Sequence, residues 1–277
     1  MVAKTRSLSK GERDFIRSVW RYYKANGRHN LPWRKTSDPY KIVVSELMLQ
    51  QTQVVRVLPK YKEFLKQFPT VRRLAAAPLG DVLKAWQGLG YNRRAKFLWL
   101  TAQSVVGEHK GKFPTTFGGL KGLPGIGHYT AGAVMNFAYN EPYPLIETNV
   151  RTVYIQHFFH NENVVADSEL APIIDQTLDR SNSREWNWAL MDYGVHLKTT
   201  VGNASVQSKA YKKQSMFKGS DREIRGAVLR VLSIAPQTNS TLTKELKNIE
   251  KNRLQLQLET LLSEGLIVKN KSGYCLP

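Results

Sequence analysis

Apolar residues recur at helical spacing through most of the first 197 residues of this chain, and no segment there alternates polar and apolar residues as a strand does. In 10–26 the apolar side chains fall on one helical face before a glycine interrupts the pattern: Phe15, Ile16, Val19, Trp20 and Tyr23. Helices of this kind bury their apolar faces against one another. We therefore predict an all-α body.

A second helix is predicted to start at Pro39, because Asp38 can cap it and proline is favoured at the first helical position. The other predicted helices of the body are 56–67, 80–88, 93–108, 115–121, 128–139, 149–159, 168–180 and 185–197.

The sequence changes character after residue 198. Residues 199–220 are polar and basic with little periodicity, which is typical of a linker or an extended arm. Residues 221–277 then show three short amphipathic helices and a hairpin around Ser272 and Gly273, the element order of a winged-helix domain. We predict a body at 1–198, a linker at 199–220 and a winged-helix-like α+β domain at 221–277 that serves DNA contact or packing.

The chain carries 41 Lys and Arg against 22 Asp and Glu, a formal net charge of +19, and such a surface attracts polyanions. We expect nucleic acid as its partner. No apolar run approaches the roughly 20 residues that span a membrane, and the N-terminal segment has no apolar leader, so we expect no membrane partner and a cytoplasmic location. The single cysteine, Cys275, cannot form a disulfide framework or a multi-thiolate metal site within one chain.

The segment LPGIGHYTAGA at 123–133 places a Gly-x-Gly turn between two predicted helices. Glycine tolerates positive φ and has no side chain to keep a phosphate away, so the N–H groups of such a turn can converge on an anion. Gly125 and Gly127 are therefore candidates for a phosphate site. A tight turn between two packed helices would produce the same pattern.

Two carboxyl groups have contrasting surroundings. Glu46 shares a predicted helical face with Ile42, Val43 and Leu49, where burial disfavours the charged form and makes it a candidate proton donor. Glu147, in PLIETNV, comes just before a predicted helix, whose dipole favours an anion. The alternatives are an ion pair inside a helical bundle for Glu46 and an ordinary cap for Glu147.

Hydrolysis of a glycosidic bond requires two carboxyl groups in opposite surroundings. One gives a proton to the leaving group, and the other stabilises the positive charge that develops on the sugar. On this ground Glu46 is the candidate acid and Glu147 the candidate anion.

The motifs that carry a resemblance are LPW at 31–33, DPYKIVVSELMLQQTQV at 38–54, FPTV at 68–71, GLGY at 88–91, GKFP at 111–114, LPGIGHYTAGA at 123–133 and the stretch at 187–194. In this order they resemble the MutY adenine glycosylases of the helix-hairpin-helix superfamily of DNA repair glycosylases. The resemblance covers roughly 10–198. It implies a two-lobed helical body that flips a nucleotide out of a duplex and hydrolyses its N-glycosidic bond.

The resemblance also implies roles for individual residues. Glu46 matches the catalytic acid and Glu147 the second carboxylate. Tyr129 stands where bifunctional relatives carry a Schiff-base lysine, and a phenol there implies hydrolysis without strand cleavage. Gln51 matches the side chain that wedges into the duplex, and Tyr91 the aromatic that contacts the opposite base. The remaining residues expected to contact DNA or substrate are Arg34, Leu49, Gly125, Ile126, Gly127, His128, Asn149 and Trp188. No cofactor is expected, although the resemblance leaves open a monovalent cation held by hairpin carbonyl groups.

The chain departs from the family pattern at four points. Glu147 replaces the usual Asp and is one methylene longer, and Trp188 stands where many relatives place Glu or Gln. Lys198 and the residues after it replace the four cysteines of an iron–sulfur cluster, so we expect a clusterless protein. The winged-helix-like unit replaces the domain that reads 8-oxoguanine.

Together these features favour a monofunctional glycosylase that removes adenine opposite 8-oxoguanine or guanine from double-stranded DNA with a mismatch or an oxidative lesion. Trp188 and the missing domain leave open a thymine or uracil glycosylase for G mismatches. Glu147 leaves open a catalytically impaired protein that binds DNA lesions. The sequence points to no particular protein partner.

Overall fold

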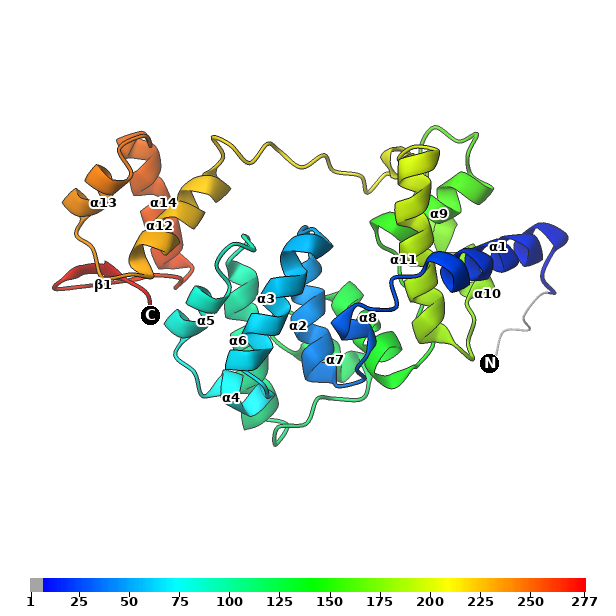
Figure 1. The fold of residues 1–277 in the computed structure, drawn as a ribbon, viewed down its shortest axis with the longest axis horizontal. Helices are drawn as coiled ribbons and strands as arrows, with labels where there is room; N and C mark the ends of the chain where they lie inside the picture. The colour runs from blue at the N-terminus through cyan, green and yellow to red at the C-terminus, as the bar shows by residue number, and fades with distance from the viewer. Residues whose placement is uncertain (1–6) are drawn as a thin grey trace. The chain divides into compact units, whose positions relative to one another are not determined.

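The structure, a computed structural model, describes residues 7–277, and the first six residues of the N-terminal segment discussed above lie outside it. In this part the chain forms fourteen α-helices, two 3₁₀ turns and one two-stranded hairpin (Figure 1). The predicted all-α body with a small C-terminal domain is confirmed. No helix among the described residues is long and apolar enough to cross a bilayer.

The helices of the body are α1 (Lys10–Asn26), α2 (Pro39–Leu49), α3 (Val54–Gln67), α4 (Val71–Ala75), α5 (Leu79–Ala85), α6 (Arg93–Gly107), α7 (Phe117–Gly122), α8 (His128–Tyr139), α9 (Thr148–Phe158), α10 (Asp167–Thr177) and α11 (Ser183–Thr200). The 3₁₀ turns are η1 (Pro32–Arg34) and η2 (Ala204–Gln207). α2 starts at Pro39 as predicted, and Oδ1 of Asp38 accepts a hydrogen bond from the N–H of Tyr40 at 2.9 Å. α4, η1 and η2 were not predicted, because five, three and four residues are too few to show a period.

The chain folds into two compact units, which are built from alternating stretches of sequence. The first takes the chain up to Ile42, Thr115–Gly118 and Gly127–Lys213, and the second takes Val43–Pro114, Gly119–Ile126 and Gln214–Pro277. The domain boundaries at 198 and 220 stay a prediction.

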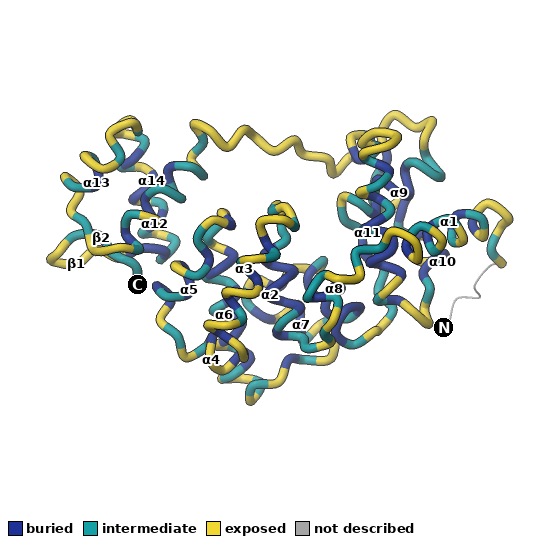
Figure 2. The backbone as a smooth tube through the Cα atoms, viewed as in Figure 1, coloured by how far each residue is buried: buried dark blue, intermediate teal, exposed yellow. Residues whose placement is uncertain are grey.

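In the first unit α9 and α11 pack against each other, with α1 and α8 on α11, and with α10 and η2 on α9. Buried residues, dark blue in Figure 2, line the contacts between these helices. Several of them are aromatic. The ring of Phe15 lies 5.1 Å from Tyr154, 5.0 Å from Phe158 and 6.1 Å from Trp186, centroid to centroid. These contacts fix α9 and α11, which carry Asn149 and Trp188, and Glu147 stands at the N-cap of α9.

The second unit contains the C-terminal module, which is α12 (Asp221–Leu232), α13 (Asn239–Glu245), α14 (Lys251–Ser263) and a hairpin of β1 (Val268–Asn270) and β2 (Gly273–Cys275). The predicted three helices and hairpin are confirmed. The module is bonded to the α5–α6 region. Gly80 donates its N–H to the carbonyl of Pro277 at 2.9 Å, and Nε2 of Gln87 donates to the carbonyl of Leu229 at 3.0 Å.

Candidate functional site

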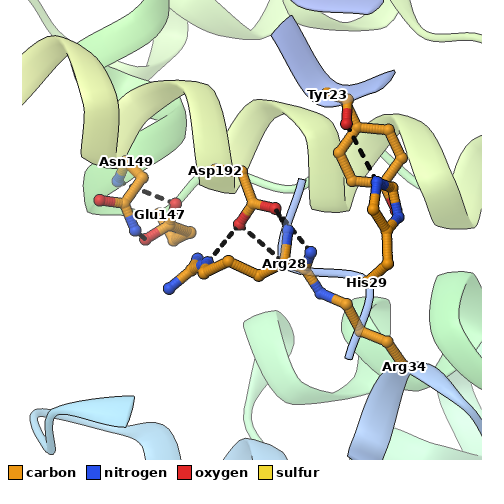
Figure 3. Close-up of polar contacts among 7 residues, drawn as sticks. All are labelled: Tyr23, Arg28, His29, Arg34, Glu147, Asn149 and Asp192. Atoms are coloured by element: carbon orange, nitrogen blue, oxygen red, sulfur yellow. Dashed lines mark hydrogen bonds and ion pairs between the residues drawn. The ribbon is translucent and has the colours of Figure 1, made fainter. Parts of the chain in front are cut away.

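Glu147 caps the N-terminus of α9, as its sequence position predicts (Figure 3). Its Oε1 accepts hydrogen bonds from the backbone N–H groups of Asn149 at 2.8 Å and Val150 at 2.9 Å. Its Oε2 accepts one from Nδ2 of Asn149 at 3.2 Å. The carboxylate thus satisfies two of the backbone N–H groups that a helix start leaves without an intrahelical partner. The extra methylene of Glu is thus accommodated without loss of the cap.

α11 carries a buried carboxylate, Asp192, that sequence reasoning missed (Figure 3). Arg34 donates to it from both terminal nitrogens at 2.7 and 2.9 Å, and Arg28 donates from its backbone N–H at 2.8 Å and from Nε at 2.6 Å. Burial opposes the charged form, but the hydrogen bonds and charges of the two arginines outweigh it and hold the pKa of Asp192 below its usual range. An Asp inside the apolar run WALMDYG was the available signal.

Arg34 and Trp188 both lie in this cluster. The Arg34 side chain is 4% exposed, and its guanidinium lies 5.4 Å from the Trp188 ring, which stacks on Phe137 at 5.6 Å. Trp188 itself is 7% exposed. The structure therefore places both in the interior of the first unit, and their contacts with the target nucleotide stay predictions.

The two glycines of the LPGIG hairpin have different structural roles. Gly125 has a φ of 75°, and a Cβ there would lie 2.4 Å from the Cβ of Phe97, so both backbone and packing require glycine. Gly127 has an ordinary φ of −80° and open space where a Cβ would be. Ile126 is 4% exposed and donates its N–H to the carbonyl of Leu123 at 3.1 Å. The first N–H groups of a helix have no partner within it, so the start of α8 is the candidate phosphate site.

His128 and Tyr129 form the first turn of α8. The Nε2 of His128 and the hydroxyl of Tyr143 share a hydrogen bond of 2.8 Å. Tyr129 lines a cavity of about 300 Å³ together with Tyr143 and the residues that lead to Ile146, next to Glu147. Tyr129 is thus brought to the segment that ends at the capping carboxylate.

Glu46 lies within α2 and is 7% exposed. On the predicted face Ile42 and Val43 are 1% and 0% exposed, whereas Leu49 at the end of the helix is half-buried. A carboxylate loses hydration in such a setting, which favours the neutral acid unless nearby groups compensate. The structure therefore confirms that Glu46 is buried, and its role as the acid stays a prediction.

Gln51 and Tyr91 are both in the left-handed backbone region, with φ values of 53° and 47°. For residues other than glycine this conformation costs about 1–2 kcal/mol each. Strain of this kind is retained where the surrounding structure enforces it, commonly at functional sites. Both residues are expected to contact DNA, so the strain lies where function is expected.

Arg94 enforces this geometry, and sequence reasoning missed it as well. Its terminal nitrogens donate to backbone carbonyls at the end of α2, in the loop after α2 and in the loop before α6. These carbonyls are those of Leu47 at 2.6 Å, Met48 at 3.0 Å, Gln50 at 2.5 Å, Leu89 at 3.1 Å and Gly90 at 3.0 Å. We call this arrangement the Arg94 clasp. Burial lowers the pKa of Arg94 to about 10, so the side chain remains a cation at neutral pH.

The C-terminal module completes the surroundings of Tyr91. Nη1 of Arg222 in α12 donates to the Tyr91 hydroxyl at 2.7 Å, and the guanidinium groups of Arg222 and Arg94 each lie 5.4 Å from the Tyr91 ring. A cavity of about 540 Å³ beside them is also lined by Gln51, Phe97 and Gly125. Guanidinium groups and an aromatic ring suit phosphates and bases.

The segment after α11, at the position expected for cluster cysteines, is held by hydrogen bonds. Val165 donates its N–H to the carbonyl of Gln207 at 2.8 Å, and Lys209 donates its N–H to the carbonyl of Val165 at 2.9 Å. Ser205 in η2 is 1% exposed. The predicted linker is thus folded over its first half, whereas 209–219 is exposed. Within 7–277 no group of three or more His, Cys, Asp or Glu is placed to hold a metal ion.

Comparison with known proteins adds to this geometry. Residues 44–174 match a family described as HhH-GPD superfamily base excision DNA repair protein. The adenine DNA glycosylase of Mycobacterium tuberculosis is 33% identical over 271 residues, which cover 90% of this chain and 89% of the relative. That of Buchnera aphidicola subsp. Schizaphis graminum is 35% identical over 185 residues, which cover 65% of this chain and 53% of the relative. The chain thus spans about half the length of the Buchnera relatives and most of the length of the mycobacterial one.

Solved structures of a DNA glycosylase and of endonuclease III also resemble this fold. A thermostable thymine-DNA glycosylase superimposes with a TM-score of 0.60 and 25% identity, covering 67% of this chain and 86% of that one. An endonuclease III trapped on DNA superimposes with a TM-score of 0.53 at 17% identity over 69% of this chain and 86% of that one, which shows a shared fold. The chain therefore belongs to the HhH-GPD superfamily of base excision DNA repair proteins and, within it, to the family of adenine DNA glycosylases.

Proposed function

We propose that this protein is a monofunctional DNA glycosylase that removes adenine mispaired with 8-oxoguanine or guanine in double-stranded DNA. The proposal rests on the different surroundings of two carboxyl groups. Glu46 is buried within α2, at 7% exposure, whereas Glu147 is half-buried at the start of α9 and accepts three hydrogen bonds. Glu46 protonates the adenine ring, and Glu147 stabilises the oxocarbenium-like sugar. The relative from M. tuberculosis, an adenine DNA glycosylase aligned over 89% of its length, supports adenine as the base.

The same proposal assigns the DNA contacts. Gln51 and Tyr91, on the strained loops held by the Arg94 clasp, enter the duplex and contact the opposite base. The start of α8 binds a phosphate, with a monovalent cation at the hairpin carbonyls. Tyr129 replaces an amine nucleophile, so the N-glycosidic bond is hydrolysed by water and no imine forms with the sugar.

A second candidate is a thymine or uracil glycosylase acting at G mismatches. The superposition with a thymine-DNA glycosylase at 25% identity and the indole of Trp188 favour it. Because Trp188 is 7% exposed and packed on Phe137, its effect on base choice is weaker than its position alone indicates.

A panel of duplexes distinguishes these functions. Duplexes with A opposite 8-oxoguanine, A opposite G, T opposite G and U opposite G are incubated with enzyme, and each sample is analysed with and without alkali. We expect alkali-dependent cleavage at A and no nick without alkali. Glu46→Gln should abolish cleavage while DNA binding persists, whereas Glu63→Gln, an exposed glutamate paired with Lys60, should match the wild type. Cleavage at T or U alone would overturn the adenine assignment, and no cleavage at enzyme excess would favour a lesion-binding protein.

A further inference from the structure

Lys198, in the last turn of α11, reaches the residue that holds the capping carboxylate. Its Nζ donates to Oδ1 of Asn149 at 2.8 Å. Gly194, one turn earlier on α11, allows this approach, because a Cβ there would lie 2.5 Å from the carbonyl oxygen and 2.7 Å from the Cβ of Asn149. Gly194 and Lys198 thus form one face of α11 that is built around Asn149.

The side-chain amide of Asn149 has one orientation that suits both of its neighbours. An ammonium group offers donors only, an ionised carboxylate offers acceptors only, and an amide has one end of each kind. Because Oδ1 accepts from Lys198, Nδ2 faces Oε2 of Glu147 at 3.2 Å. A flipped amide would set oxygen against carboxylate and NH₂ against ammonium. Lys198 therefore selects the orientation in which Asn149 holds Glu147.

The charges at the two ends of this chain of hydrogen bonds attract each other. Burial lowers the pKa of Lys198, and the negative charge of Glu147 acts in the opposite direction. The attraction is weakly screened because Lys198 and Glu147 are both half-buried. Among the charged and titratable groups on the elements packed around α11, Arg28 is paired with Asp192 and His128 with Tyr143. Arg151 of α9 is paired with Asp167, and its positive charge also interacts with the negative charge of Glu147.

We propose that Lys198 is a positioning residue of the glycosylase reaction that, acting through Asn149, holds Glu147 in one rotamer. The inference rests on the proposed function, which makes Glu147 the anion that faces the sugar. The proposal also assigns a role to a residue at the position where this chain lacks the cysteines of its family. A side chain that reaches the candidate active site stands where the cluster cysteines would begin.

The first test separates positioning from folding. Single-turnover base release is measured on the duplex identified by the panel for Lys198→Met, Lys198→Arg, Asn149→Ala and the double variant Lys198→Met/Asn149→Ala. We expect Lys198→Met to slow release about tenfold or more, since displacements of about 1 Å in an active site can cost 10²-fold, with an unchanged DNA dissociation constant. Lys198→Arg, which keeps the charge and the donors, should recover most of the rate.

In the Asn149→Ala background Lys198→Met should have less than about a twofold further effect, because Lys198 acts through that amide. Lys209→Met, an exposed lysine in the same region, should match the wild type. Independent, multiplicative losses from the two substitutions would overturn the proposal. So would an equal loss for Lys198→Met and Lys198→Arg.

The second test requires no catalysis. The Cε resonance of Lys198 is titrated by NMR in the DNA-free protein and assigned by its absence in Lys198→Met. We expect a pKa below that of a free lysine, and a further decrease in Glu147→Gln, because the charge that raises the pKa is lost. An unchanged pKa in Glu147→Gln would refute the coupling. If the wild type releases no base from any duplex, the proposed function fails, while this titration still decides whether Lys198 and Glu147 are coupled.

Discussion

Asp192 is a charged side chain in the interior of the first unit. It is stable there because two arginines from a distant part of the sequence pair with it. Arg28 and Arg34 flank the LPW motif more than 150 residues before Asp192, and together they satisfy both carboxylate oxygens. Burying a carboxylate costs free energy unless such partners compensate. The ion pairs of the two arginines therefore connect the segment around the LPW motif to α11.

Asp192→Asn should lower the free energy of unfolding by about 3–5 kcal/mol, because it leaves the buried guanidinium of Arg34 without its anion. The depressed pKa means that the wild-type carboxylate stabilises the fold fully above the pKa of about 3.9 that it has when unfolded, and that this contribution is lost as the pH falls through the lower folded value. Urea unfolding at pH 7 and at pH values below about 4 measures both effects. Asp175→Asn, a matched change in an exposed pair with Arg180, should cost at most about 1 kcal/mol. Equal costs for the two variants would contradict this account.

At the scale of elements, the Arg94 clasp binds the end of α2 and the loop before α6 into one body. Arg94→Met should remove hydrogen bonds to several buried carbonyls and lower the free energy of unfolding by about 3 kcal/mol or more. The strained φ values at Gln51 and Tyr91 should then relax, so DNA binding should weaken as well. Chemical denaturation and fluorescence anisotropy measure the two effects. For stability, Arg93→Met is the control, since the Arg93 side chain is 61% exposed, and a comparable loss of stability there would contradict the role of the clasp.

The helices could be predicted from the sequence because their signals are local. The period of α1, the cap at Asp38 and the hairpin turn at Gly273 each lie within a few residues of the element that they define. The surroundings of Glu46 and Glu147 were predictable for the same reason. Arg94 and Asp192 were not, because an arginine or an aspartate in a helix is usually exposed. Arg94 also bonds to carbonyls more than 40 residues away, at and just after the end of α2, and Asp192 bonds to arginines more than 150 residues away. Lys198 shows the same limit, since its contact with Asn149 depends on how α11 packs on α9.

On the scale of the whole molecule, the C-terminal module adds cations beside residues expected to contact DNA. Arg222→Ala should weaken duplex binding and reduce the slope of log K against log salt by about 1 if Arg222 binds a phosphate. Dissociation constants between about 50 and 200 mM salt give the slope. Arg253→Ala, at an exposed pair with Asp221 on the same module, serves as the control for the change of charge. An unchanged slope would assign the module to packing, and deletion of 221–277 should then lower stability without altering the salt dependence.

The Arg94 clasp also bears on how such a protein would search DNA. Two loops that become ordered when the protein folds lose their conformational entropy once. Each encounter with a duplex then begins with both loops already ordered. A segment that became ordered only on contact would incur that loss at every site it inspects. For loops that contact DNA as proposed, we therefore expect the buried guanidinium to favour rapid inspection of many base pairs over adaptation to each one.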